Sequence, residues 1–297
     1  MAQLGAIKPG RYKPNLSSTI DWTHPLSQGL ELCLPFNTLY SNCFIESVSE
    51  SKYLLGNTVG GAAPTVTYGP TSTAVNSGLP NDPSINFVTG ITSNALIVDT
   101  NDTTTTLSNI SSEKIFTMRV KFCLNALPSN QNSTWRCFFS KGNAFETVGT
   151  VNTSLFMGIS NSGVRATFGA QDNGNSTYNI NSSQITAATL GITANKWIDL
   201  VVVWRQSNAI HDWYVNGNFI TLQTGITAVT QPVTNVNPIV VGGYPVYNPS
   251  TSTSALNTTA PTYAMLGRIS NIMLWSRRLT ANEIKQLYQF PYTMFNN

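Results

Sequence analysis

The stretch GRISNIMLWSRRLTANEIKQLYQFPYTMF, residues 267–295, indicates the fold more clearly than any other part of the chain. Two sets of side chains alternate along its first nine residues, 267–275, and this alternation predicts a strand. Thr280 and Glu283 then have the spacing of a capping box, in which the two residues satisfy backbone N–H groups at the start of a helix. We therefore expect a strand followed by a short helix.

The predicted helix needs a surface to pack on. Ile284, Leu287 and Tyr288 recur at i, i+3 and i+4, which predicts one apolar face. Leu279 before the cap and Ile284 after it are placed as a hydrophobic staple, and Pro291 ends the pattern. Because a helix this short is marginal on its own, we expect its apolar face to dock on the rest of the protein.

Short strand patterns precede this stretch. IFTMRVKFCL, residues 115–124, alternates cleanly and predicts a half-buried strand. KWIDLVVVWR, residues 196–205, is apolar on both faces in its middle and predicts a central strand of a two-layer structure. In DWYVNGNFI, residues 212–220, Asn-Gly predicts a type I′ hairpin. Many short strands separated by turn signals predict an all-β sandwich or jelly roll.

The composition excludes several classes of partner. Only 10% of the 297 residues are charged, against about a quarter in an ordinary soluble domain. The net charge is +3 and the basic residues are scattered, so we expect no nucleic acid. No apolar run reaches the roughly 20 residues of a membrane helix, and we expect no membrane partner. Residues 1–14 lack the apolar region of a secretory signal, which predicts synthesis and retention in a cytoplasm.

The four cysteines show no metal-binding pattern. Cys33, Cys43, Cys123 and Cys137 have no zinc spacing and form no CxxC motif. Cys123 and Cys137 flank a predicted hairpin and could approach each other. We nevertheless expect free thiols, because the absence of a secretory signal removes the need for disulfides.

The order of the motifs resembles one family. KWIDLVVVW, IHDWYVNGNFI, NPIVVGGY and GRISNIMLWSRRLTANEIKQLY follow the pattern of laminin G-like domains, which belong to the concanavalin A-like lectin/glucanase jelly rolls. The resemblance covers residues 84–290 and implies a jelly-roll β-sandwich. We expect an N-terminal arm over residues 1–28 and one sandwich over residues 29–297, with the short helix near its end.

The two ends of the chain resemble a narrower group. IDWTHPLSQGLELCLPFN, residues 20–37, and PYTMF, residues 291–295, are similar to the ends of laminin G-like proteins encoded by tailed bacteriophages. This resemblance implies a virion structural protein that decorates the capsid or another virion surface after synthesis in the host cytoplasm. It implies other virion proteins, such as the major capsid protein, as partners, and a homo-oligomer for which a trimer is one arrangement. The alternative is a tail-associated lectin that binds the host receptor.

A polysaccharide-degrading glycosidase is a third reading. Family 16 glucanases of this fold carry E-x-D-x-x-E or E-x-D-x-E, which places carboxylates on one face of a strand to flank the scissile bond. Glu46 and Glu50 have no Asp between them and no strand pattern around them. His211 lies beside Asp212, but no G-x-S-x-G nucleophile motif accompanies them. We therefore expect no enzymatic activity.

Three groups of residues are the candidate sites. Calcium is the family's common ion and the one expected cofactor, and a polar loop offers it oxygen ligands. The same residues are also typical of an ordinary turn. Sugars stack on exposed aromatic side chains, and three tyrosines border the low-complexity loop at residues 248–262, where they could equally pack the loop down. The calcium candidates are Asp99, Asn101 and Asp102; the glycan candidates are Tyr244, Tyr247 and Tyr263; the residues expected to anchor the arm to the particle are Arg11, Tyr12, Lys13, Trp22 and His24.

Overall fold

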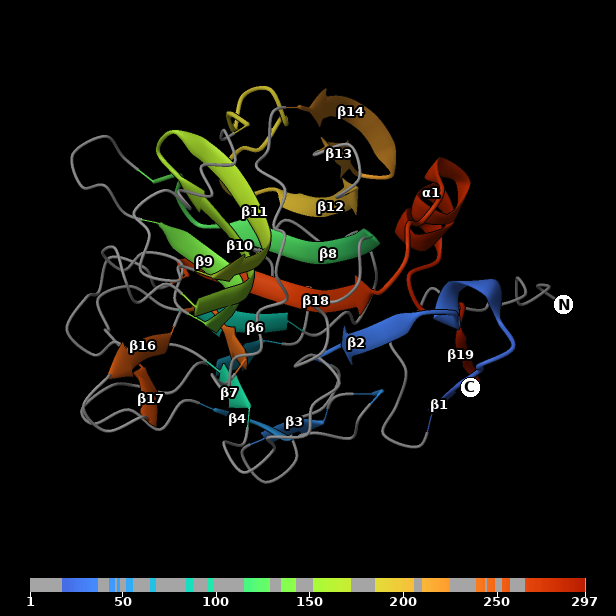
Figure 1. Ribbon diagram of the computed structural model, residues 1–297, viewed down its shortest axis with the longest axis horizontal. Coiled ribbons are helices and arrows are strands. Elements are labelled where there is room, and N and C mark those ends of the chain that lie inside the picture. Colours follow the sequence, from blue (N-terminus) through green and yellow to red (C-terminus); the bar gives the residue numbers. More distant parts are fainter. Residues whose placement is uncertain are drawn as a thin grey trace, which may run out of the picture.

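The computed structural model describes sixteen segments of the chain. They are residues 18–36, 43–45, 47–48, 52–55, 65–67, 84–87, 96–98, 115–128, 135–142, 152–171, 185–205, 210–224, 239–243, 245–248, 253–256 and 265–296. In these segments two large antiparallel sheets form a sandwich, with one α-helix, α1 (Ala281–Gln289), and one short 3-10 helix, Pro25–Ser27 (Figure 1). The predicted all-β sandwich with a short helix after its last long strand is confirmed.

Each large sheet draws its strands from distant parts of the chain. The eight-stranded sheet runs β14 (Asn218–Gln223), β13 (Ile210–Val215), β12 (Trp197–Arg205), β8 (Ile115–Leu124), β18 (Gly267–Trp275), β6 (Ser84–Phe87) and β5 (Thr65–Thr67), with β2 (Leu30–Leu34) also paired to β18. The seven-stranded sheet runs β11 (Gly163–Gln171), β10 (Asn152–Ser160), β9 (Arg136–Gly142), β15 (Ile239–Val241), β7 (Leu96–Val98), β4 (Lys52–Leu55) and β3 (Cys43–Ile45). Two small pairs join β1 (Thr19–Ile20) to β19 (Phe295–Asn296) and β16 (Pro245–Asn248) to β17 (Thr253–Leu256).

The larger hydrophobic core, which we call the inner core, fills the space between the large sheets. Alternate residues of β8 line one side of it, as the sequence pattern predicts: Phe116, Met118, Val120, Phe122 and Leu124. Phe122 stacks on Phe138 of β9, with 4.2 Å between ring centroids. This contact joins the two sheets directly, so the alternation along β8 fixes which face of the sheet meets its partner.

Two predicted hairpins are present, whereas the one expected between Cys123 and Cys137 is not, because β8 and β9 lie in different sheets. Asn216 and Gly217, between β13 and β14, have φ values of 50° and 77°. A type I′ turn needs positive φ at both central residues, which explains the Asn-Gly pair at this point. Strands β10 and β11 pair around a second tight turn, at residues 161–162.

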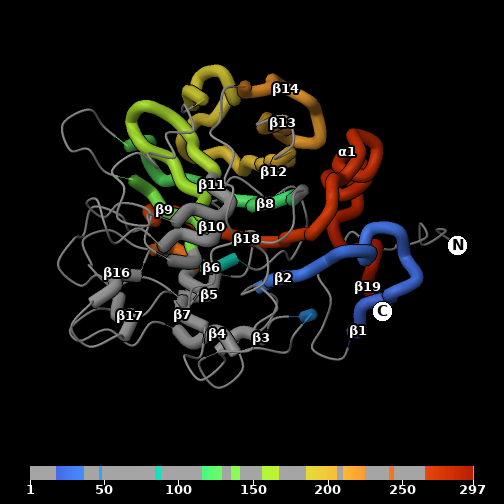
Figure 2. Tube along the Cα trace, in the orientation of Figure 1, coloured from blue at the N-terminus to red at the C-terminus, as the bar shows by residue number. Residues whose placement is uncertain are grey.

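A second cluster, the outer core, lies on the other face of the eight-stranded sheet. It brings the two ends of the described chain together, as the adjacent blue and red segments show in Figure 2. Its buried members include Ile20, Leu26, Leu30, Cys33, Val201, Val203, Tyr214, Met273, Trp275, Leu279, Ile284, Leu287, Tyr292, Met294 and Phe295. This cluster supplies the docking surface that the short helix needs.

The outer core corrects the prediction that β8 is half-buried. Its second face carries Thr117, Arg119, Lys121 and Cys123, and all four are buried. Thr117 Oγ1 accepts a hydrogen bond from the backbone N–H of Leu279, and Arg119 Nη2 donates to the carbonyl of Leu287. Polar alternation therefore marks a face covered by the end of the chain rather than a face exposed to solvent.

Two finer predictions about residues 267–290 also differ from the structure. A register shift between Ile269 and Asn271 breaks the alternation of β18, so Ile269 joins Ile272 in the inner core. The capping box of Thr280 and Glu283 is present as predicted, but Tyr288 is 46% exposed and does not join the buried helix face. One extra residue in a strand reverses the faces of all that follow, which a strict period of two does not anticipate.

Candidate functional site

The two ends of the described chain form one unit, the terminal clasp, made of residues 18–30 and 275–296. Strand β1 pairs with β19, the backbone N–H of Asp21 donates to Met294 at 2.8 Å, and that of Ser276 donates to Gly29 at 2.7 Å. In the sequence, residues 20–37 and 291–295 are two stretches far apart. The structure shows that much of both belongs to the same unit.

Two side chains from the C-terminal part hold the N-terminal turn in place. The indole Nε1 of Trp275 donates to the carbonyl of Leu26 at 2.7 Å in a buried position. The Arg277 guanidinium donates to the carbonyl of Gln28 at 2.5 Å, to that of Pro25 at 2.7 Å and to the Glu283 carboxylate at 2.8 Å. Because the guanidinium group is planar and rigid, Arg277 fixes the turn relative to the start of α1.

The N-terminal turn also satisfies its own polar groups. The Asp21 carboxylate accepts from the backbone N–H of Thr23 at 2.9 Å and from its hydroxyl at 2.6 Å, and these bonds lower the pKa of Asp21. Ser27 Oγ lies 2.7 Å from the carbonyl of Asp21, and Gln28 Nε2 donates to the carbonyl of Trp22. The turn is therefore held by its own side chains as well as by the clasp.

The structure separates the two predicted anchoring residues that it describes. His24 Nδ1 accepts from the backbone N–H of Leu26 at 3.1 Å and caps the 3-10 helix, so this imidazole helps to shape the turn. Trp22 is 51% exposed. An exposed tryptophan on an ordered turn is the kind of side chain that anchors protein interfaces. Its anchoring role stays a prediction.

A buried ion pair positions α1 over the sheet. The Asp199 carboxylate on β12 accepts from Arg119 Nε at 2.9 Å and from Nη2 at 2.5 Å. Burial alone would lower the pKa of Arg119, but the charge and hydrogen bonds of Asp199 outweigh it and raise that pKa. Arg119 also donates to the Leu287 carbonyl in the last turn of α1, at 3.3 Å. Sequence analysis did not identify this pair, because its members lie 80 residues apart.

The described ionisable groups offer no arrangement typical of acid–base catalysis. His211 packs edge-on to the Trp204 and Trp213 rings, at 4.7 and 5.9 Å between centroids. Burial lowers the pKa of His211 to about 3, although a hydrogen bond with Gln223 acts in the opposite direction. Asp212 pairs with Arg205 at 2.6 Å. His211 is thus a neutral packing residue.

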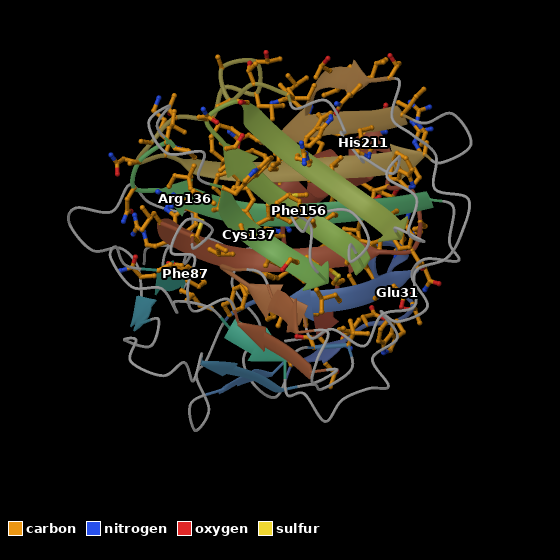
Figure 3. The ribbon with its side chains drawn as sticks, turned by 60° about the vertical axis from the view of Figure 1, so that its left-hand side comes forward. Glu31, Phe87, Arg136, Cys137, Phe156 and His211 are labelled. Atoms are coloured by element: carbon orange, nitrogen blue, oxygen red, sulfur yellow. The ribbon has the colours of Figure 1, made fainter. Side chains whose placement is uncertain are left out.

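The outer face of the seven-stranded sheet carries a cluster that the sequence analysis missed. Figure 3 shows Arg136, Cys137 and Phe156 on the strands of this sheet. Trp135 meets Phe156 edge-on at 5.6 Å, and the Arg165 guanidinium lies 4.9 Å above the Trp135 ring. A Cβ on Gly158 would lie 2.7 Å from Phe156, so the glycine makes room for that ring. Phe156 and Trp135 are buried, and this cluster is a packing motif.

The remaining predicted site residues lie outside the described parts of the chain. These are Arg11, Tyr12, Lys13, Asp99, Asn101, Asp102, Tyr244 and Tyr263. Tyr247 lies in β16, paired with Ser254 of β17, but its side chain is not described. In the described segments no three His, Cys, Asp or Glu residues gather where they could hold a metal ion. The glycan and calcium sites therefore stay predictions.

Two other expectations concern the cysteines and the membrane. Cys33, Cys123 and Cys137 are buried, and among the described residues none of the three forms a disulfide. In the described part of the chain, no helix has both the length and the apolar character to span a membrane.

Comparison with known proteins relates the chain through its fold. Its sequence matches no protein-family model and no curated protein. The receptor-binding domain of a botulinum neurotoxin C/D mosaic serotype aligns over 88% of this chain and 51% of its own, with a TM-score of 0.52 and 12% identity. The binding domain of botulinum neurotoxin DC, in complex with rat synaptotagmin II, covers the same shares with a TM-score of 0.51 and 13% identity. Trypanosoma rangeli sialidase aligns over 88% of this chain and 33% of its own, with a TM-score of 0.47 and 15% identity.

These matches correct the prediction that the protein is not an enzyme. They include sialidases together with receptor-binding domains, so the comparisons give no ground for excluding an enzyme. The chain spans about a third to a half of the length of the matched chains, and the likeness to the receptor-binding domains shows a shared β-sandwich fold.

Proposed function

We propose that this protein is a surface component of a tailed-bacteriophage virion, attached through the terminal clasp and able to bind glycans at its opposite end. The clasp is the observation that carries this proposal. Its two halves contain the DWTHPL and PYTMF stretches that resemble phage laminin G-like proteins, and they bond to each other through Asp21 and Met294. The two stretches that carry the resemblance are far apart in sequence but lie together in one structural unit.

The arrangement of the fold supports attachment at one end and glycan binding at the other. The clasp lies at one end of the long axis and the β16–β17 hairpin, which carries Tyr247, lies at the other (Figure 1). A protein attached through the clasp would present this hairpin away from the particle. The botulinum receptor-binding domains show that folds of this kind serve recognition, which supports a binding role by analogy.

The low charge of the chain fits a protein that packs against other subunits. With 10% charged residues, its surface is built from Ser, Thr and Asn side chains. Such a surface pays little desolvation cost when neighbours cover it. Trp22, exposed on its fixed turn, would be the anchor on the attachment side.

Reconstitution with particles that lack the protein tests the proposal. Purified protein is added to virions of a deletion phage and the bound fraction is measured. We expect saturable binding by the natural chain and at least about tenfold weaker binding by Trp22→Ala. Leu127→Ala is the matched control, because Leu127 is 40% exposed and follows β8 at the end of β18 remote from the clasp.

Two further measurements address location and glycans. Mass spectrometry of purified virions should detect the protein, and its absence would defeat the virion role. Labelled antibody imaged on the particle separates a capsid site from the alternative tail site. A glycan array read with wild-type protein and with Tyr247→Ala tests the distal end, and equal signals from the two would remove Tyr247 from the site.

A further inference from the structure

Strand β14 forms an edge of the eight-stranded sheet, and its described protection is a single β-bulge: the register with β13 shifts between Trp213 and Tyr214, so Ile220 is an extra residue in β14. Among the described strands only β13 pairs with it. Its sequence, NFITLQ, contains no charged residue and no proline, the residues that commonly block an open edge. Phe219, Ile220 and Leu222 are 51%, 39% and 49% exposed. An edge with this composition is a template for pairing with another strand.

The exposed side chains form one surface with the end of α1. Phe219 lies opposite Tyr214 in the β13–β14 ladder and Leu222 lies opposite Asp212, so both point to the outer face. Tyr288 of α1 packs against the turn that starts β14. A Cβ atom added to Gly217 in that turn would lie 2.9 Å from the Cβ atom of Tyr288. We name Phe219, Ile220, Leu222 and Tyr288 the apolar edge.

The charges beside the apolar edge are already neutralised. Asp212 pairs with Arg205 at 2.6 Å and lies 3.5 Å from Arg278. A partner strand would therefore meet apolar side chains and backbone groups, and the Asp212 charge beside them is already paired. This favours an uncharged, apolar strand as the occupant.

The strand is complementary to itself in antiparallel pairing. The bulge at Ile220 places Phe219 and Leu222, three positions apart, on the same outer face. With a two-fold axis between Ile220 and Thr221, Phe219 of one copy lies opposite Leu222 of the other, and the bulged Ile220 of each copy lies beside the axis. In the same register Asn218 of one copy lies opposite Gln223 of the other. Both side chains belong to the face of the sheet that meets the inner core, because their partners in β13 are Val215 and His211. A shift by one residue would oppose outward and inward side chains.

We propose that two copies of this chain form a two-fold symmetric dimer through β14, which joins their eight-stranded sheets into one continuous sheet. The backbone edges supply hydrogen bonds, and cross-strand contacts of Phe219 with Leu222 supply apolar burial on the outer face. A two-fold contact is isologous, so one patch serves both copies. The dimer is independent of the virion role and holds for the isolated protein.

Sedimentation equilibrium of the full chain tests the dimer. We expect a dimer for the natural chain and at least about tenfold weaker association for Leu222→Lys, which places a charge in the apolar contact. Leu127→Lys is the control, because it puts the same charge on an exposed leucine three strands away in the sheet. Circular dichroism confirms that both variants are folded.

Cysteine cross-linking tests the register. Ile220→Cys and Thr221→Cys chains should cross-link much faster when mixed than either does alone, because the proposed axis lies between these two positions. A natural chain that stays monomeric at about 0.1 mM, or a dimer that Leu222→Lys leaves unchanged, would overturn the proposal. Equal cross-linking in the mixture and in the separate samples would overturn the register.

Discussion

Both faces of the eight-stranded sheet are buried along its central strand β8, but different parts of the chain cover them. The inner face meets a second sheet and is almost wholly apolar along β8. The outer face carries Arg119 and Lys121 and is covered in part by α1 and the terminal clasp. The inner core therefore depends on apolar alternation, whereas the outer core depends on polar groups that must find partners.

Removing one partner of the buried ion pair in the outer core should lower the free energy of unfolding more than any other change proposed here. Asp199→Ala leaves the Arg119 guanidinium buried without its carboxylate, which should cost about 3–5 kcal/mol in the free energy of unfolding. Urea denaturation measures this loss. Replacing both members, as Arg119→Met with Asp199→Leu, should recover most of it, because no unpaired charge is left. A cost below about 1 kcal/mol for Asp199→Ala would mean that water compensates Arg119.

Mild acid should act first on the inner core, through His211. The pKa of His211 is about 3 in the folded protein, below its ordinary value of 6.5. Between these values the unfolded chain binds a proton that the folded protein does not. Stability therefore falls as the pH drops below 6.5, by about 1.4 kcal/mol per pH unit and about 2 kcal/mol at pH 5.

The comparison of His211→Phe with the natural chain isolates this effect. Thermal unfolding is measured for both from pH 7 to pH 4. The variant should lose stability less steeply below pH 6.5, whatever its stability at pH 7. Parallel curves for the two proteins would show that another group controls the acid response.

The smallest expected effect concerns the start of α1. Thr280→Ala removes the hydroxyl that accepts from the Glu283 backbone N–H at 3.3 Å, and it should cost about 1 kcal/mol of stability. Asn282→Ala, an exposed position in the first turn of the same helix, is the control. Thermal unfolding measures the difference. Equal melting temperatures for Thr280→Ala and Asn282→Ala would mean that the capping bond does not contribute to stability.

Local features of the fold were predictable from the sequence. The capping box, the Asn-Gly turn and the inward residues of β8 each depend on neighbours within a few positions. The burial of Arg119 was not predictable, because it depends on a helix that follows 160 residues later in the chain. The register shift at Ser270 also needs the partner strand to define it.

The candidate site shows the same division. Trp22 and His24 were recognised from their motif, but their different roles follow from the turn that surrounds them. Arg277 counted only as one of the scattered basic residues in the sequence, although it makes contacts on both sides of the clasp. The sequence feature that indicates this role is the position of Arg277 between a predicted strand and a capped helix. A long side chain with several N–H donors can bond to both neighbouring segments from that position.

The pairing of β1 with β19 has a consequence for synthesis. Residues 19 and 20 emerge early from the ribosome, yet their partners are residues 295 and 296. Strands β2 and β6 likewise wait for β18, the last long strand. The earlier segments must therefore stay unpaired in these contacts until residues 267–296 have been made, and such distant pairings fold slowly. During that interval their unpaired strand edges and apolar side chains favour aggregation of the nascent chain.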